Sequence, residues 1–187
     1  MELITKTLET ERLILRPFRL EDAEDAFRNY CSDPQVTKYL TWPTYQDVSE
    51  AHARMAFMQQ AYANGETFDW AIAPKELGQV IGSIGPVSKR EDIDMVHIGY
   101  CIGSRWWHQG FMTEAFSAVI DYLFTDCGVN RIETMHDPNN PHSGDVMKKC
   151  GLRYEGTSRQ SDRNNQGICD AAHYAILRED WIKGKSL

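Results

Sequence analysis

The sequence predicts a single α/β (α+β) domain over residues 1–187, with helices flanking one mixed, mostly antiparallel central sheet. Three observations predict this class. Segments with strand and helix periodicity follow one another in the order βααβββαβαββ. The Gly, Pro and Asn clusters are short, so none of them resembles a linker. A chain of 187 residues, 42% of them hydrophobic, is long enough for one sizeable core.

The first third of the chain is predicted to hold one strand and two helices. Residues 12–18, RLILRPF, have the aliphatic content of a strand, and residues 20–30 place alanine and aromatic side chains on one helical face. A second helix has apolar residues at spacings of three and four from Val48 onward, and Asn64-Gly65 is expected to end it.

The pattern then changes to the period of strands. Three short alternating or β-rich runs, separated by Pro, Gly and charged residues, predict three consecutive antiparallel strands. Helical period returns in residues 112–124 and, after one more strand, in residues 141–150. The strands predicted in this part of the chain are residues 68–74, 79–87, 95–102, 131–136, 153–159 and 171–177.

Composition excludes several kinds of partner. The 20 Lys and Arg residues against 27 Asp and Glu residues give a net charge of −7, which disfavours binding to nucleic acid or anionic membranes. The 5 cysteines are widely spaced without a C-x-x-C pair, so a disulfide framework and a zinc ribbon are both unexpected. No stretch is apolar enough for a signal or membrane segment, and we expect a cytoplasmic protein.

The most informative stretch is a strand–loop–helix junction, MVHIGYCI-GSRWWHQGF-MTEAFSAVIDYLF. Unpaired backbone N–H groups and the positive end of a helix dipole meet at such a junction, which suits a phosphate group. Thr113 adds a hydroxyl in the first turn of the helix. Gly110 stands in the middle of the loop, but neither common nucleotide-binding glycine pattern is present, so an ordinary βα connection also fits.

A second stretch, HDPNNPHSGDVMKKCGLRYEG, combines a turn with a short helix. Pro141 is expected to begin this helix and Gly151 to follow its end. Asn140 and Ser143 stand at the start of the helix, where capping is the usual role of such side chains.

Together these segments resemble the GNAT superfamily of acyl-CoA-dependent N-acetyltransferases, in its RimJ/RimL-like branch of the ribosomal-protein-alanine acetyltransferase type. Three motifs in family order carry the resemblance over nearly the whole chain: TERLILRPFRLEDAEDAF, IGYCIGSRWWHQGFMTEAFSAVIDYLF and DPNNPHSGDVMKKCGLRYEG. The resemblance implies the acyl-CoA N-acyltransferase fold, in which the sheet splays between its fourth and fifth strands. Acetyl-CoA would then lie in the V-shaped gap.

The resemblance also implies the cofactor contacts. The pantetheine arm would pair with the backbone of one strand, the pyrophosphate would bind backbone N–H groups of the loop, and Asn140 would bond the pantetheine amide. The expected cofactor-binding residues are Tyr100, Cys101, Ile102, Trp107, His108, Gln109, Gly110, Phe111, Met112, Thr113, Asn140 and Ser143. His108 and Met112 replace small residues of the family. The Met112 side chain either crowds the phosphates or points into the sheet while its N–H still donates.

Transfer from a thioester to an amine needs a proton acceptor, a donor for the carbonyl oxygen and a proton for the thiolate. A backbone N–H near Cys101 is expected to hold the oxygen. Ser143 is the expected proton donor, because Met147 stands where many relatives have tyrosine. His97 is the expected base, since several relatives carry a catalytic glutamate on this strand. Asp94, Glu66 and solvent are the alternative bases; Ser143 could instead cap its helix, and His97 could point away from the cleft.

Trp42 is expected to line the amine pocket, and Tyr45, Trp70 and Trp106 are further candidates. We expect no metal site, although His136, Asp137 and His142 lie close in sequence. The expected function is acetyl transfer from acetyl-CoA to a primary amine, foremost a protein N-terminal amine, by direct attack on the thioester.

Three alternatives stay open at this point. The acceptor could be a small amine or an antibiotic, or the chain could bind acyl-CoA without turning it over. A cysteine hydrolase using Cys101 or Cys150 has no supporting constellation of residues. By analogy with the family, a homodimer is a further possibility.

Overall fold

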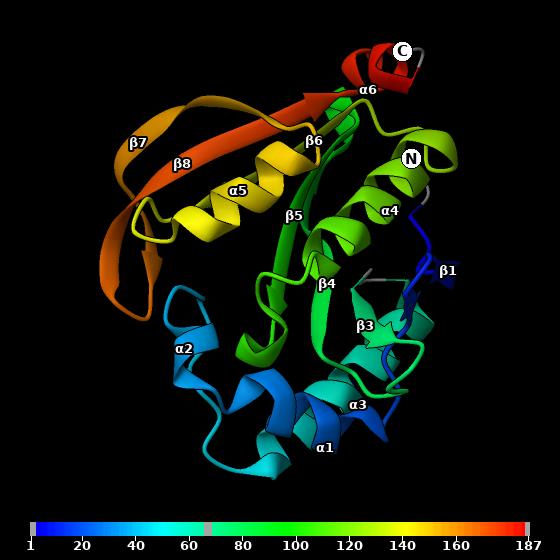
Figure 1. The fold of residues 1–187 in the computed structure, drawn as a ribbon, viewed down its shortest axis with the longest axis vertical. Helices are drawn as coiled ribbons and strands as arrows, with labels where there is room; N and C mark the ends of the chain where they lie inside the picture. Colours follow the sequence, from blue (N-terminus) through cyan, green and yellow to red (C-terminus); the bar gives the residue numbers. More distant parts are fainter. Residues whose placement is uncertain (1–2, 66–68, 186–187) are drawn as a thin grey trace.

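A computed structural model describes residues 3–65 and 69–185 and contains one eight-stranded sheet with helices on both faces (Figure 1). The strand order is β1-β2-β3-β4-β5-β6-β8-β7, and every neighbouring pair is antiparallel except β5 and β6. The predicted fold class is confirmed. The strands are β1 (Leu8–Glu9), β2 (Leu13–Arg16), β3 (Trp70–Pro74), β4 (Gly82–Arg90), β5 (Met95–Ile102), β6 (Arg131–His136), β7 (Arg153–Asn164) and β8 (Gly167–Leu177).

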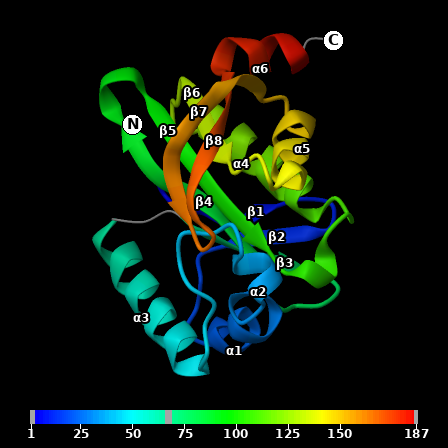
Figure 2. The same ribbon diagram turned by 90° about the vertical axis from the view of Figure 1, so that its left-hand side faces the viewer.

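The helices form two layers on opposite faces of the sheet. In Figure 2, α1 and α3 stand on the side of the molecule opposite to α4 and α5. None of the helices in the described residues combines the length and apolar character that crossing a bilayer requires. The helices are α1 (Asp22–Ala26), which continues into a π-helical turn η1 (Phe27–Cys31), then α2 (Pro34–Thr37), α3 (Val48–Asn64), α4 (Phe111–Thr125), α5 (Pro141–Lys149) and α6 (Arg178–Lys185), with short 3-10 turns η2 (Glu91–Ile93) and η3 (Ser104–Trp106).

Side chains alternate between the two faces of the sheet along each strand, so each face contributes apolar residues to its own core. On one face, Ile72 and Ile98 pack with Phe116 of α4. On the other face, Ala71 of β3 packs with Met55 of α3. The same alternation therefore decides which strand residues face α4 and which face α3.

Helix α3 begins and ends where its sequence signals predict. Asp47 caps it by accepting from the Ser49 N–H, and Glu50 completes a capping box. Gly65 ends the helix in a left-handed conformation with φ of 69°. Local residues at both ends therefore specify α3, the helix that packs on the Ala71 face of the sheet.

Five elements differ from the sequence prediction. Strand β1, helix α2 and helix α6 were not expected, and β7 and β8 form a longer hairpin than expected. Because β1 adds a strand at the edge, the predicted fourth and fifth strands are β5 and β6. The predicted strand start at Phe68 lies outside the described residues.

The parallel pair β5 and β6 opens along its length. The two strands pair only at Met95 with Arg131, Val96 with Ile132 and His97 with Glu133. Beyond these pairs β5 continues to Ile102 without β6 beside it. The predicted splay is present, and it leaves one edge of β5 free for another chain or ligand.

An ion-pair network fixes the beginning of α4 to the edge of the sheet. Glu114 Oε1 accepts from the Thr10 hydroxyl at 2.6 Å and from the Arg12 N–H at 2.8 Å, and Glu114 Oε2 accepts from Arg12 Nε at 2.7 Å. Arg12 also donates to the carbonyl of Gln109 at 3.0 Å. The loop before α4 is therefore held from outside the cavity that it lines.

We expect Glu114→Gln to destabilise the protein by about 1–2 kcal/mol at pH 7. Burial alone would raise the pKa of Glu114, but the hydrogen bonds from Thr10 and Arg12 bring it below its usual value. A carboxylate with a lowered folded-state pKa stabilises the fold above its unfolded pKa, near 4.3, and this stabilisation disappears as pH falls through the folded pKa. Urea unfolding of both proteins at pH 7 and about pH 3 should show the difference shrinking in acid. Glu91→Gln, at an exposed pair with Lys89, is the matched control and should change little at either pH.

Candidate active site

Two cavities meet where β5 and β6 separate. The first, of about 230 Å³, lies between the loop after β5, the start of α4 and the start of α5. The second, of about 750 Å³, lies on the α3 side of the sheet. Residues common to both cavities are Tyr39, Leu40, Tyr100, Cys101, Asn140 and Ser143. Two molecules entering from opposite sides would therefore meet at Tyr100, Cys101 and Ser143.

The first cavity has an anion-binding end formed by backbone. Gly110 is the N-cap of α4 with φ of 81°, and no side chain caps this helix. The N–H groups of its first turn thus point toward the cavity without an intrahelical partner, beside Thr113. His108 also has positive φ, 59°, a conformation that glycine adopts more easily than other residues. The Met112 side chain is only 5% exposed and packs in the core, so the sheet-facing alternative is the observed one.

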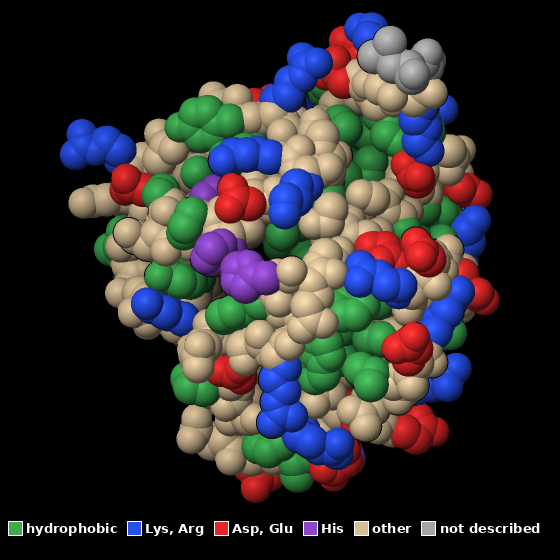
Figure 3. Space-filling view, viewed as in Figure 1, with side chains coloured by type: hydrophobic (Ala, Val, Ile, Leu, Met, Phe, Trp, Pro, Cys, Tyr) green, Lys and Arg blue, Asp and Glu red, His purple; other side chains and the backbone are tan. Residues whose placement is uncertain are grey.

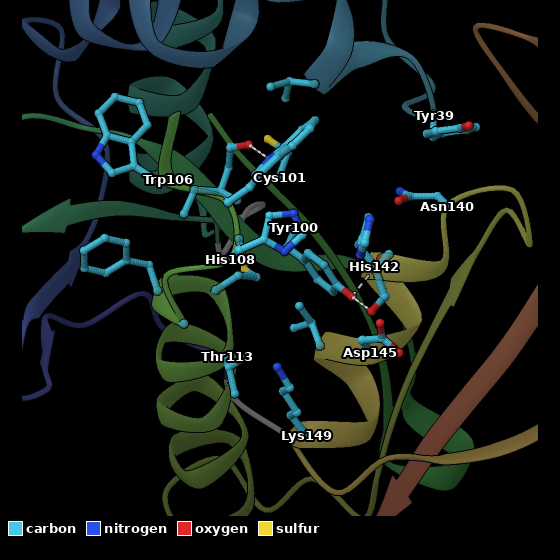
Figure 4. A pocket seen from close by; sticks show the side chains of 18 of the residues that line it. Tyr39, Tyr100, Cys101, Trp106, His108, Thr113, Asn140, His142, Asp145 and Lys149 are labelled. Atoms are coloured by element: carbon cyan, nitrogen blue, oxygen red, sulfur yellow. Dashed lines mark hydrogen bonds between the residues drawn. The ribbon is translucent and has the colours of Figure 1, made fainter. Parts of the chain in front are cut away.

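Eleven of the twelve residues expected to bind cofactor line this cavity, and Figure 4 shows several of them. The exception is Gln109, whose side chain donates to the Arg105 carbonyl at 2.8 Å. Lys149 lines the cavity, whereas Lys148 forms an exposed pair with Asp145. The cavity therefore has one cationic side chain from α5 in addition to its backbone donors.

Two histidines face each other across the first cavity. His108 from the loop and His142 from α5 form an edge-to-face ring pair with centroids 4.8 Å apart (Figure 4). Histidine side chains also lie beside a hollow on this face of the molecule (Figure 3). They narrow the cavity between α4 and α5.

The free edge of β5 carries backbone donors. The Gly103 N–H donates to the Ile81 carbonyl at 2.8 Å, on the side of the strand that faces β4. Because N–H groups alternate sides along a strand, those of Tyr100 and Ile102 face the opening instead. The backbone donors near Cys101 that face the opening are therefore the N–H groups of its two neighbours, and the oxyanion donor near Cys101 stays a prediction.

Tyr100 and Ser143 form a hydrogen-bonded pair at the junction of the cavities. The Tyr100 hydroxyl donates to the Ser143 carbonyl at 3.0 Å and lies 2.9 Å from Ser143 Oγ (Figure 4). Burial raises the pKa of Tyr100, so its hydroxyl stays protonated at neutral pH. Sequence reasoning assigned only the backbone of Tyr100, since no local pattern reveals a contact 43 residues away.

His97 lies on the floor of the second cavity. Its Nδ1 is 3.6 Å from Glu133 Oε1, and Glu133 Oε2 in turn accepts from Arg131 at 3.1 Å. Burial lowers the pKa of His97, and the Glu133 carboxylate opposes this shift. His97 is therefore neutral at pH 7 and able to accept a proton.

The alternative bases differ in their placement. Asp94 is exposed, outside the cavity lining, and its carbonyl accepts from the N–H groups of Asn130 and Arg131. Glu66 lies outside the described residues. Asp69, which sequence reasoning did not select, lines the second cavity beside Arg54.

Aromatic side chains occupy different parts of the site. Trp42 lines the second cavity and packs on Tyr45 with centroids 5.5 Å apart. Trp106 lines the first cavity. Trp70 is buried in the core and donates to the Lys6 carbonyl at 2.7 Å, so it does not face an acceptor.

The turn between β7 and β8 closes one side of the second cavity. Asn165 donates from its side chain to the carbonyls of Thr37 and Trp42, both at 2.8 Å. Its N–H donates to the Leu40 carbonyl at 3.1 Å. The hairpin is thereby tied to the loop that carries Tyr39 and Trp42.

The cysteine alternative lacks an activated thiol. Burial raises the pKa of Cys101 and raises that of Cys150 to about 11, so both are thiols at neutral pH. Within the described residues, no three His, Cys, Asp or Glu side chains come together as metal ligands. His136 contacts the Asp137 carbonyl, whereas His142 contacts His108.

A sheet that opens between parallel strands, with a helix N-terminus on one side and a second cavity on the other, defines the acyl-CoA N-acyltransferase class. Comparison with known families makes the assignment specific. The model of the acetyltransferase (GNAT) domain matches residues 12–153, and the chain belongs to that family. It is accordingly an acyltransferase.

Individual proteins that the chain resembles are also named as acetyltransferases. The uncharacterized N-acetyltransferase p20 of Bacillus licheniformis is 34% identical over 176 residues, covering 94% of this chain and 98% of the relative. The ribosomal protein uS5-alanine N-acetyltransferase of Escherichia coli (strain K12) is 25% identical over 185 residues, covering 95% and 94%. A solved structure of RimL, a ribosomal L7/L12 alpha-N-protein acetyltransferase in complex with coenzyme A, shares the fold with a TM-score of 0.82 at 16% identity, covering 92% and 98%. These similarities support the RimJ/RimL-like branch.

Proposed function

We propose that this protein transfers the acetyl group of acetyl-CoA to a primary amine, foremost a protein N-terminal amine, by direct attack on the thioester. The observation that carries the proposal is the meeting of two cavities at Tyr100, Cys101 and Ser143. One cavity has the donors that a pyrophosphate needs, and the other has a neutral base. Five free cysteines fit action in the cytoplasm.

The cofactor would enter the first cavity. Its pyrophosphate would accept from the first-turn N–H groups of α4, and Thr113 would add a hydroxyl. The pantetheine arm would pair with the free edge of β5, and Asn140 would bond its amide. In this arrangement the thioester carbonyl lies near the outward N–H groups of Tyr100 and Ile102, which would stabilise the developing negative charge.

The acceptor would enter the second cavity, beside Trp42. The neutral His97 would take a proton from the amine, and the Ser143 hydroxyl would donate one to the departing thiolate. The Tyr100 hydroxyl would then turn from the Ser143 carbonyl and return a proton to Ser143 Oγ, which lies 2.9 Å away. Nitrogen–carbonyl bond formation and carbon–sulfur cleavage then yield an amide and coenzyme A.

Calorimetric titration with acetyl-CoA tests the proposal, followed by thiol release with N-terminal Ser, Ala and Met peptides, polyamines and aminoglycosides. We expect binding and release with peptides. Release only with polyamines or aminoglycosides would reassign the acceptor. Binding without release on any acceptor would favour a binding module, and absence of binding would reject the proposal.

The pH dependence of kcat/KM should follow the protonation of His97. Because burial lowers the pKa of this base, we expect the acidic limb below the usual histidine value of about 6.5. Glu133→Gln removes the carboxylate that opposes this shift, so the limb should move to still lower pH while turnover at pH 8 changes little. His97→Ala should remove the limb and lower kcat/KM by about 100-fold. A His97→Ala profile identical to that of the native protein would show that another group is the base.

A further inference from the structure

An ion pair of unassigned role lies in the second cavity. Arg54 of α3 donates from Nη2 to Asp69 Oδ2 at 3.2 Å, and both residues line the cavity. The side chains are 29% and 19% exposed, so the pair is mostly shielded but reaches the cavity surface. The Asp69 backbone is fixed as well, because its carbonyl accepts from the Tyr62 hydroxyl at 2.5 Å.

The second carboxylate oxygen of Asp69 is left for an occupant. Among the described residues, no hydrogen bond reaches Asp69 Oδ1, which lies over the bare backbone of Gly85: a Cβ there would come within 2.4 Å of it. Across the neighbouring strand, Gly85 pairs with Gly99, a further lining residue without a side chain. Asp69 itself covers Gly85, and Val87 covers Gly99, with Val87 Cγ1 3.2 Å from the position that a Cβ would take, so Asp69 and Val87 together line the cavity over these two glycines.

Arg54 also has donors to spare. A guanidinium carries five N–H donors. The bond to Asp69 and an interaction with the Tyr45 hydroxyl use fewer than that. The pair therefore presents an acceptor and adjacent donors to the same cavity.

We propose that Arg54 and Asp69 recognise a backbone peptide group of the acceptor, with Asp69 Oδ1 accepting its N–H and Arg54 donating to its carbonyl. The inference rests on the proposed function and makes the acceptor a peptide. A peptide group offers one donor and one acceptor, which matches the acceptor and the donors that this pair presents. A polyamine offers only cationic donors, which Arg54 would repel.

The distance from the reaction point fits this assignment. Asp69 packs directly over Gly85, which pairs with Gly99 of β5, and Cys101 follows two residues further along β5. One strand spacing and two residues of rise, about 8 Å in all, therefore separate Gly85 from Cys101, and two to three residues of an extended peptide span that distance. A peptide whose N-terminal amine lies near Cys101 would thus present its second or third peptide group to the pair.

The test combines a variant with altered acceptor peptides. Acceptors in which each of the first three peptide N–H groups is replaced in turn by an ester oxygen are compared by kcat/KM. At one position the ester should lower the kcat/KM of the native protein by about tenfold or more, because a hydrogen bond to a charged group is lost. In Asp69→Ala the same ester should cost about twofold or less, since the coupled partner is already absent.

Asp162→Ala is the matched control, because Asp162 lines the opposite wall of the same cavity and should preserve the full ester penalty. Asp69→Asn, which keeps the shape and a weaker acceptor, should give an intermediate penalty and guards against misfolding of the alanine variant. Equal ester penalties in the native protein and in the Asp69 variants would overturn the inference. Acetylation of polyamines but of no peptide would also overturn it, while leaving acetyl transfer intact; failure to bind acetyl-CoA would instead reject the proposed function.

Discussion

Gly110→Val is expected to abolish acetyl-CoA binding, with no heat released at concentrations that saturate the native protein. Gly110 has φ of 81°, and a β-branched residue is strongly disfavoured there. A Cβ would meet only Arg12 Nη2, at 3.4 Å, so the obstacle is backbone conformation and not space. Relief of this strain would rotate the first-turn N–H groups of α4 away from the pyrophosphate site. Calorimetric titration measures the loss.

Gly128→Val is the matched control for this effect. Gly128 follows the same helix at its other end, has φ of 70°, and has nothing within 4 Å of the position that a Cβ would take. The substitution introduces comparable strain away from the cavity, so it should lower stability and leave acetyl-CoA affinity unchanged. Equal loss of affinity in both variants would contradict a local role for Gly110.

Ser143→Ala is expected to lower kcat by about 100-fold while changing the dissociation constant of acetyl-CoA by less than about threefold. The serine hydroxyl stands where both cavities meet, and its loss removes the proposed proton donor to the thiolate. Tyr100 remains, but its hydroxyl keeps its bond to the Ser143 carbonyl, at 3.0 Å. Steady-state thiol release and calorimetry separate the two quantities.

Tyr100→Phe extends the same experiment. It keeps the ring that packs on Phe116 and removes the hydroxyl that contacts Ser143 Oγ. We expect a smaller loss of kcat than for Ser143→Ala and little further loss when both substitutions are combined, since the two hydroxyls act as a unit. Unchanged turnover of Ser143→Ala would transfer the donor role to water or to Tyr100.

Periodicity and end signals predicted most of the fold. Helix α3 has a stripe of apolar residues and a glycine at its end, and β5 is a run of residues that favour strands. Local sequence is therefore enough to predict both elements. Strand β1 has two residues and α2 has four, which is too short for any periodic signal. Helix α6 has no buried residue, so it lacks the apolar stripe by which helices are recognised in a sequence.

The residues of the candidate site also fall into two groups, those that local sequence predicts and those that only the folded structure reveals. The expected cofactor residues follow consecutive motifs, and nearly all of them line one cavity. The Tyr100–Ser143 and Arg54–Asp69 pairs join different elements, and their partners become visible only after the sheet has formed. Asp69 lies near the start of the strand predicted over residues 68–74 and carries no motif, so nothing in the sequence distinguishes it from an ordinary surface carboxylate.

The three hydrogen bonds of Asn165 also bear on the order of folding. The side-chain bonds join residues that are 128 and 123 positions apart in the chain. Contacts of such sequence separation carry a large loop-closure entropy and form late. The cofactor side of the molecule, built from β5, α4 and α5, is contiguous from residue 95 to 149. We therefore expect the enclosed acceptor side to assemble after the cofactor side and to open before it when the chain begins to unfold.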